Sequence, residues 1–106
     1  MDVETDDRIA KLNDQFRKTA SQIVFTQGVL AFGFAALTDI SVELRMYNDF
    51  NENNDPYGEH DFGSFEYEGE KLFWKIDYYD QELKYGKDPL DPECNRVLTV
   101  MLAEEY

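Results

Sequence analysis

The segment from Phe62 to Tyr79 constrains the fold most, because apolar and polar side chains alternate along it on both sides of a glycine. Side chains of a β-strand point to the two faces of a sheet in turn, so such alternation is typical of half-buried strands. Gly69 is the turn residue between the two runs, and the pattern therefore predicts a hairpin over about 62–79. One face of this hairpin is predicted to be core and carries Phe65, Tyr67, Leu72, Trp74 and Ile76.

Three further segments have apolar residues at the three- and four-residue spacing of a helix face. The first follows a predicted cap at Thr5, with Asp6 and Asp7 in the first turn, where the helix dipole favours negative charge. The last follows Asp91 and Pro92, a cap residue and the proline that a first helical turn accepts. Helices are therefore predicted over about 6–20, 39–50 and 92–104.

The remaining segments complete a single domain over residues 1–106, since no composition shift marks a linker. Gln22 to Thr26 is β-branched and aromatic and predicts a short strand. Val29 to Leu37 is apolar and leaves two alternatives, an extension of that strand or a loop beneath the core. Asn51 to Gly58 is rich in turn-forming residues and predicts a loop. This order predicts the α+β class, with a small antiparallel sheet around the hairpin, covered by helices.

The charge balance excludes several classes of function. The chain has 23 Asp and Glu against 10 Lys and Arg, a net charge of −13. Binding of nucleic acid through a basic surface, and docking on anionic lipid, both need the opposite sign. One cysteine cannot form an internal disulfide, and the N-terminus is acidic where a signal peptide would be basic. We therefore expect a cytoplasmic protein with no membrane partner.

The acidic residues concentrate between Asp49 and Glu70, where no lysine or arginine occurs. Glu66 and Glu68 are expected to face solvent about 6.7 Å apart, at ~3.3 Å per residue, a spacing of the same order as the phosphates of DNA. An acidic row of this kind can imitate a phosphate row; the alternative is a solvated face that serves solubility. With two tyrosines as anchors, the predicted interaction surface comprises Glu52, Asp55, Tyr57, Glu66, Glu68, Glu70 and Tyr79.

The loop before the hairpin holds the one cluster with the residue types of a chemical site: Asp55, Glu59, His60 and Asp61. His60 can act as a general base, or the carboxylates can hold a hard cation, or the cluster is structural, which is the interpretation we favour. Adjacent residues of an extended chain point to opposite faces, so at most two of 59–61 are expected to converge. Cys94 is expected to be an inert, buried thiol. The chain has no zinc ligand set and no phosphate-binding loop, and we predict no metal and no cofactor.

Two strings, NDPYGEHDFG at 54–63 and FWKIDYYD at 73–80, together with the ending at 97–106, resemble a small bacterial family, domain-of-unknown-function family thirty-seven sixty-eight. The resemblance begins at Leu12 and covers most of the chain, with a departure around 31–37. The family is frequent in alphaproteobacteria and on mobile elements, and it brings no catalytic residue to carry over. Its setting implies an inhibitor, because small acidic inhibitors of host defence are common among mobile-element genes.

The sequence thus favours a small acidic interaction protein without enzymatic activity, although it leaves that last point open. The expected role is an inhibitor of anti-CRISPR or anti-restriction type, and the expected partner is a basic, nucleic-acid-binding protein of a host-defence complex. The alternative is a small enzyme or a cation-binding protein that uses the loop from Asp55 to Asp61.

Overall fold

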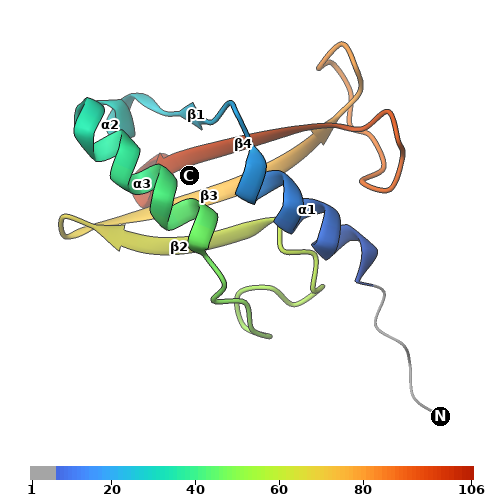
Figure 1. Ribbon diagram of the computed structural model, residues 1–106, viewed down its shortest axis with the longest axis horizontal. Helices are drawn as coiled ribbons and strands as arrows, with labels where there is room; N and C mark the ends of the chain where they lie inside the picture. The colour runs from blue at the N-terminus through green and yellow to red at the C-terminus, as the bar shows by residue number, and fades with distance from the viewer. Residues whose placement is uncertain (1–6) are drawn as a thin grey trace.

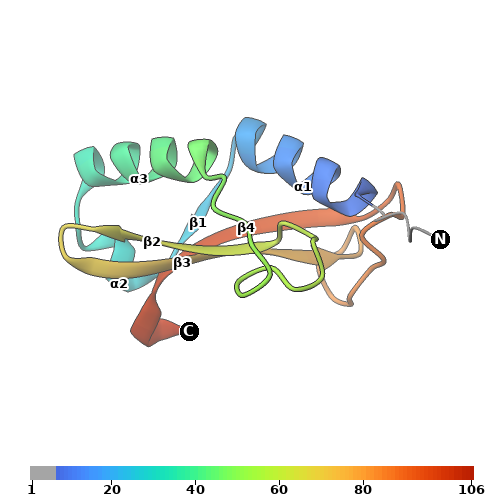
Figure 2. The same cartoon turned by 90° about the horizontal axis from the view of Figure 1, so that it is seen from below.

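The computed structural model describes residues 7–106, so the predicted cap Thr5 and Asp6 lie outside the described residues. Helices α1 and α3 lie side by side on one face of a sheet, and the C-terminus lies on the other side (Figures 1 and 2). In chain order the elements are α1 (Arg8–Thr19), β1 (Val24–Phe25), α2 (Gln27–Leu30), α3 (Phe34–Met46), β2 (Phe62–Tyr67), β3 (Glu70–Tyr79), β4 (Asn95–Leu102) and the short 3₁₀ helix η1 (Ala103–Glu105).

The sheet has four strands in the order β1-β4-β3-β2. The strands β2, β3 and β4 pair antiparallel, whereas β1 pairs parallel with β4. The α+β class predicted from the sequence is confirmed, but the sheet is mixed, because the short β1 runs in the same direction as β4. Within residues 7–106, no helix combines the length and the apolar character needed to cross a membrane.

The predicted hairpin is confirmed in its position and in the side chains that share its core face, and the structure fixes its register. Tyr67 is opposite Glu70, so Glu68 and Gly69 alone form the turn, and both have positive φ, 52° and 80°. This is the geometry that two-residue hairpin turns favour, and glycine adopts it at the lowest cost. Gly63 is opposite Trp74 on the core face, and an added Cβ there would lie 2.5 Å from the indole nitrogen. The glycine is therefore needed for the tryptophan to fit.

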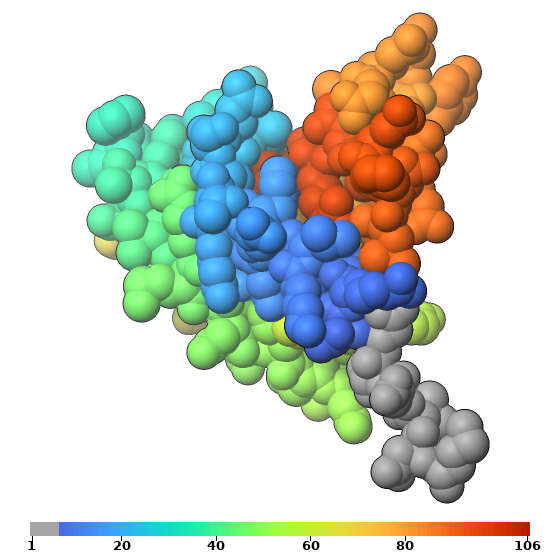
Figure 3. All heavy atoms as spheres, turned by 45° about the vertical axis from the view of Figure 1, so that its right-hand side comes forward, coloured from blue at the N-terminus to red at the C-terminus, as the bar shows by residue number. Residues whose placement is uncertain are grey.

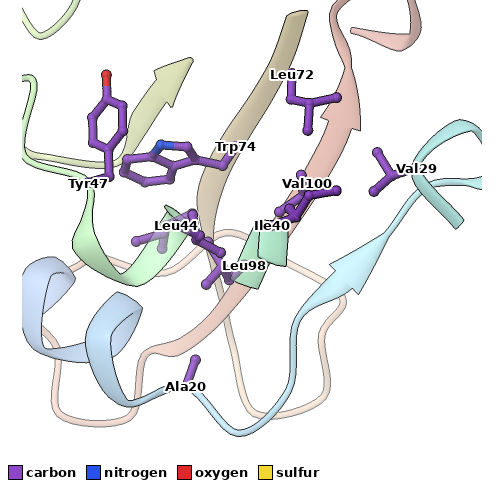
Figure 4. Close-up of a cluster of buried hydrophobic side chains, with 10 residues drawn as sticks. Ala20, Val29, Ile40, Leu44, Tyr47, Leu72, Trp74, Leu98 and Val100 are labelled. Carbon is purple, nitrogen blue, oxygen red and sulfur yellow. The ribbon is translucent and has the colours of Figure 1, made fainter. Parts of the chain in front are cut away.

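The core lies between the sheet and α3, with Trp74 of β3 at its centre (Figure 4). The Trp74 side chain is completely buried, as the alternation predicts. Its ring meets the edges of Tyr47 and Phe50 at centroid distances of 5.3 Å and 6.1 Å. Aromatic rings bury more apolar area than other side chains, so they contribute most to the stability of a small core. The other fully buried apolar side chains are Val29, Ile40, Leu44, Leu72, Leu98 and Val100.

The helix predicted over 92–104 is wrong, since this segment forms β4, followed by η1 at its end. The apolar spacing fits a helix, but Leu98 and Val100 also alternate with residues that face away, and both are buried beside β3. Asp91 does not cap a helix: its carboxylate accepts a hydrogen bond from the Glu93 amide (2.8 Å) in a turn. Pairing with the whole of β3 outweighs the local helical pattern, because every residue of β4 gains a strand partner.

The boundaries of the other helices also differ from the prediction. The segment from Val29 to Leu37 is neither strand nor loop, since it contains the end of α2 and the start of α3. Gly33, with φ at 95°, provides the sharp turn between them, so α3 begins and ends earlier than 39–50. The first helix begins at Arg8, and Asp7 precedes it and pairs with Lys11 at 3.2 Å.

Candidate functional site

A buried polar network joins α1 to the loop before β2 and to β3 and β4, and Asn13 lies at its centre. Its side chain is completely buried. The amide nitrogen donates to the Glu59 carbonyl (2.9 Å) and to the Tyr78 hydroxyl (2.8 Å), and the amide oxygen accepts from Arg96 (2.7 Å). Buried polar groups are stable only with such partners. In the sequence, the signal of this network is a polar residue, Asn13, at a position that the helical spacing places on the core-facing side of α1.

Arg17, one helical turn further on, attaches the same helix to the end of α3. Its guanidinium is buried and donates to the carbonyls of Leu44 (3.1 Å) and Tyr47 (2.9 Å). These carbonyls lie at the C-terminus of α3, where a helix has free acceptors and a negative dipole end. The Asp14 carboxylate lies 3.0 Å from the Arg17 guanidinium and balances its positive charge. The guanidinium also lies over the Trp74 ring, 5.2 Å from the ring centroid. α1 thus packs between α3 and the segment before β4 (Figure 3).

His60 is engaged from three sides. Its Nδ1 lies 2.9 Å from an Asp14 oxygen, and its Nε2 lies 3.5 Å from Asp55. The ring stacks on Phe50, with centroids 3.8 Å apart and planes 3° apart. The backbone has φ at 56°, which a non-glycine residue holds only when its surroundings enforce it. Because both ring nitrogens face carboxylates, neither is free for a substrate, and the geometry favours the structural interpretation over a general base.

Glu59 and Asp61 lie close enough for their side chains to interact, which agrees with the expectation that at most two of residues 59–61 converge. Burial raises the pKa of Asp61, which accepts a hydrogen bond from the Tyr78 hydroxyl (3.3 Å). Burial, with the charges of Asp61 and Asp55, also raises the pKa of Glu59. Among residues 7–106, no three side chains of the ligating types are grouped so that they can hold a metal ion. The cation site considered for this loop thus has no geometry to support it.

The residues of the predicted interaction surface do not form one surface. Glu66, Glu68 and Glu70 are exposed together at the turn of the hairpin, whereas Tyr79 lies at the other end of β3, roughly 30 Å away at ~3.3 Å per residue. The Asp55 side chain is only 7% exposed, because it accepts hydrogen bonds from two backbone amides of its own loop. The remaining two residues, Glu52 and Tyr57, are exposed on that loop, which lies apart from the hairpin turn (Figure 1).

The hairpin acids have different neighbours from those that the linear sequence shows. Lys71 lies directly opposite Glu66 on β3, so a basic residue stands beside the acidic row. Its ammonium is placed over the Phe73 ring, 5.4 Å from the centroid. Glu68 lies close enough to Tyr67 for its charge to act on the tyrosine hydroxyl. The acidic row therefore continues toward α3 rather than toward the loop at 51–58.

A groove between α3 and β2 gathers carboxylates around an apolar floor, and we call it the α3–β2 groove. Loss of solvent around the Tyr67 hydroxyl, with the nearby carboxylates of Asp39 and Glu68, raises the pKa of this tyrosine. The hydroxyl donates to Asp39 at 3.2 Å. On the floor, Val42 is 50% and Met46 75% exposed. The lining consists of Asp39, Val42, Glu43, Met46 and Tyr67.

Asp39 and Glu43 are not among the predicted site residues, although their four-residue spacing places them on one side of a helix. Cys94, expected on a helix, is instead half-buried in the turn that leads into β4. The α3–β2 groove brings two exposed apolar side chains together with two carboxylates, and we take it as the candidate functional site.

A family model described as a protein of unknown function (DUF3768) matches residues 25–105. The chain belongs to this family. The resemblance seen in the two sequence strings is thereby confirmed, and the match covers the sheet, α3, the histidine loop and the α3–β2 groove. No curated protein and no solved structure shows significant similarity to the chain. The family's description gives no activity, so the function has to be argued from the geometry.

Proposed function

We propose that this member of the family is a non-enzymatic interaction protein that binds a basic protein through the α3–β2 groove. The observation that carries the proposal is the pair of carboxylates on α3, Asp39 and Glu43, beside the exposed apolar side chains of Val42 and Met46. None of the residues lining the groove is basic. By contrast, the carboxylates of the histidine loop are engaged in contacts within the protein.

The two components of the groove have different physical roles. An exposed ion pair contributes only ~0.2–1 kcal/mol, so the carboxylates act mainly on the association rate and on the choice of partner. Affinity requires apolar anchors, and Val42 and Met46 provide area that loses contact with water on binding. Methionine suits this role because its unbranched side chain adapts to the shape of a partner.

The finer form of the proposal concerns the partner. A net charge of −13 and a carboxylate groove are complementary to proteins whose own surfaces bind phosphate. We infer that the partner is a nucleic-acid-binding protein and that the chain inhibits it by occupying its basic surface. A host-defence complex of the CRISPR or restriction type is the partner class that fits an inhibitor carried by a mobile element.

The test uses a photocrosslinking residue in place of Val42, introduced into the full chain in bacterial cells. The captured protein is then purified, and its affinity is measured for the native chain and for two charge variants. The first, Asp39→Lys with Glu43→Lys, reverses the groove. The second, Glu82→Lys with Glu93→Lys, changes the net charge equally at exposed acids far from the groove.

We expect the captured protein to be basic and to release DNA when the native chain binds. The groove variant should bind it about tenfold more weakly or worse at low salt, a loss of ~1.4 kcal/mol or more, while the control variant stays near the native affinity. The difference should shrink as salt rises, because charges farther apart than about 8 Å are screened at physiological ionic strength. An equal loss of affinity in both variants would show that only the net charge of the protein matters, and it would contradict the proposal.

A further inference from the structure

The strand β2 forms one edge of the sheet, and half of that edge is open. Tyr67 and Glu70 close a two-residue turn, so they exchange both backbone hydrogen bonds with each other. Bonded and non-bonded pairs alternate along an antiparallel ladder, and the main-chain groups of Ser64 and Glu66 therefore point away from β3. The contact of the Ser64 amide with the Tyr47 hydroxyl, at 3.4 Å, agrees with this orientation.

The open part of the edge is centred on Glu66. Its side chain is exposed, and nothing in residues 7–106 forms a hydrogen bond with its backbone amide or carbonyl on the outer side. The Ser64 carbonyl next to it is equally open, whereas the Ser64 amide has the long contact with Tyr47. On the opposite edge of the sheet, β1 has two residues and pairs with Thr99 and Val100 of β4. An open strand edge is a template for another strand.

The α3–β2 groove lies beside this same part of the edge, because Tyr67 belongs to both. A strand added to β2 would run about 4.8 Å from it, with every second side chain directed to the helix side of the sheet. Those side chains would meet Asp39 and Glu43, with Val42 and Met46 between them. Lysine and arginine combine a cationic end with an apolar stem, so they match both parts of the groove.

A second copy of this chain is a poor occupant of the edge. Each copy has a net charge of −13, and pairing two β2 edges would bring Glu66 and Glu68 of one copy close to those of the other. Like charges on neighbouring strands destabilise a sheet, and a charged side chain on an edge is a common device against self-association. The occupant that fits is an extended basic segment of a different protein.

We infer that the partner binds by strand addition: an extended segment rich in lysine or arginine pairs with β2 at Ser64 and Glu66 and places alternate side chains in the α3–β2 groove. This inference rests on the proposed function and specifies its binding mode. Main-chain hydrogen bonds would hold the segment, and the groove would select its side chains. Sequence preference of the partner segment should therefore follow a two-residue period.

The experiment compares Glu66→Pro with Glu66→Gln. Both remove the charge, but only proline removes the outward amide, and at this edge position it leaves the hydrogen bonds between β2 and β3 intact. The probe is a fluorescent peptide that alternates threonine with lysine or leucine and is long enough to span the six residues of β2. Its binding to the full chain is followed by fluorescence anisotropy. We expect Glu66→Pro to bind about tenfold more weakly than Glu66→Gln.

A second probe keeps the test valid if proline disturbs the hairpin. Two further peptides have the same sequence, one N-methylated at its odd-numbered and the other at its even-numbered backbone amides, and both retain every charge. The peptide whose methylated amides would face β2 should lose binding to the native chain, whereas the other should bind. Equal binding of both methylated peptides and of both Glu66 variants, or no binding of the unmethylated peptide, would overturn strand addition. The proposed function would then still be judged on the captured partner and the groove variant. A native dimer in sedimentation that Glu66→Pro dissociates would instead make the second copy the occupant.

Discussion

The two carboxylate-rich regions of this protein use the same residue types in opposite ways. Around His60, the carboxylates of Asp14, Asp55 and Asp61 each have a partner within the protein, and the Asp14 contact holds the loop on α1. In the α3–β2 groove, the Glu43 carboxylate faces solvent beside exposed apolar side chains. Carboxylates with internal partners stabilise a fold, whereas carboxylates that remain solvated are available to another molecule.

This contrast explains why the cluster that looks most like an active site is the weaker functional candidate. A histidine between acids is a familiar catalytic pattern, but both of its ring nitrogens are engaged. The contrast leads to three expectations for the network, in which changes should affect folding and leave binding at the α3–β2 groove unchanged.

The largest effect is expected for Arg17→Ala. The substitution removes one donor each from the carbonyls of Leu44 and Tyr47 and from the Asp14 carboxylate, and it removes packing against Trp74. We expect the free energy of unfolding to fall by about 3 kcal/mol, measured by urea denaturation. Lys18→Ala, at the exposed neighbouring position, is the control and should change it by no more than about 0.5 kcal/mol. Similar values for both would show that the network carries little stability.

A smaller effect is expected for His60→Ala. The loop loses its contacts to Asp14 and to the Phe50 ring, while the strands remain paired. A loss of about 1–2 kcal/mol is expected, with unchanged affinity for the basic partner in the same assay as the groove variants. If His60→Ala keeps its native stability but abolishes the biological activity, the roles of the two regions are the reverse of those assigned above.

The smallest effect is a change in pH dependence, expected for Asp61→Asn. Burial raises the pKa of Asp61, so the folded state binds this proton more tightly than the unfolded chain. Stability should therefore fall as pH rises from the ordinary carboxyl range through the raised pKa, and the cost is fully present above it. The variant should show a flatter decline of Tm with pH, although Glu59, also raised, preserves part of the slope. Glu82→Gln, at an exposed position, should leave the slope unchanged; an equal flattening there would refute the assignment to Asp61.

Local patterns predicted the hairpin well and the last element badly, for one physical reason. The turn at Glu68 and Gly69 closes strands that are adjacent in sequence, so their register follows from the turn type. The strand β4 pairs with β3 across a loop, and its apolar spacing is compatible with either a helix or a strand. The segment at 29–37 was ambiguous for a related reason, since the positive φ of Gly33 fixes where α3 begins.

The site shows the same division. Alternation along an extended chain predicted that at most two of residues 59–61 would converge, and the structure decided that the two are Glu59 and Asp61. The sequence did not predict that Asp14 would be the partner of His60, since the two lie 46 residues apart. Nor did it predict that the acidic row would continue onto Asp39, which reaches Tyr67 only because α3 lies beside β2.

The sequence by itself determined the acidity of the surface, the α+β class, the hairpin with its buried Trp74 face and the membership of the family, since these depend on composition, local alternation and motif strings. The tertiary structure decided that the last apolar segment is a strand, that the histidine loop is engaged internally, and that the open carboxylates lie between α3 and β2. The reason is that the partner of a buried polar group, or of a strand, is chosen by packing between distant segments, and no local pattern contains that information.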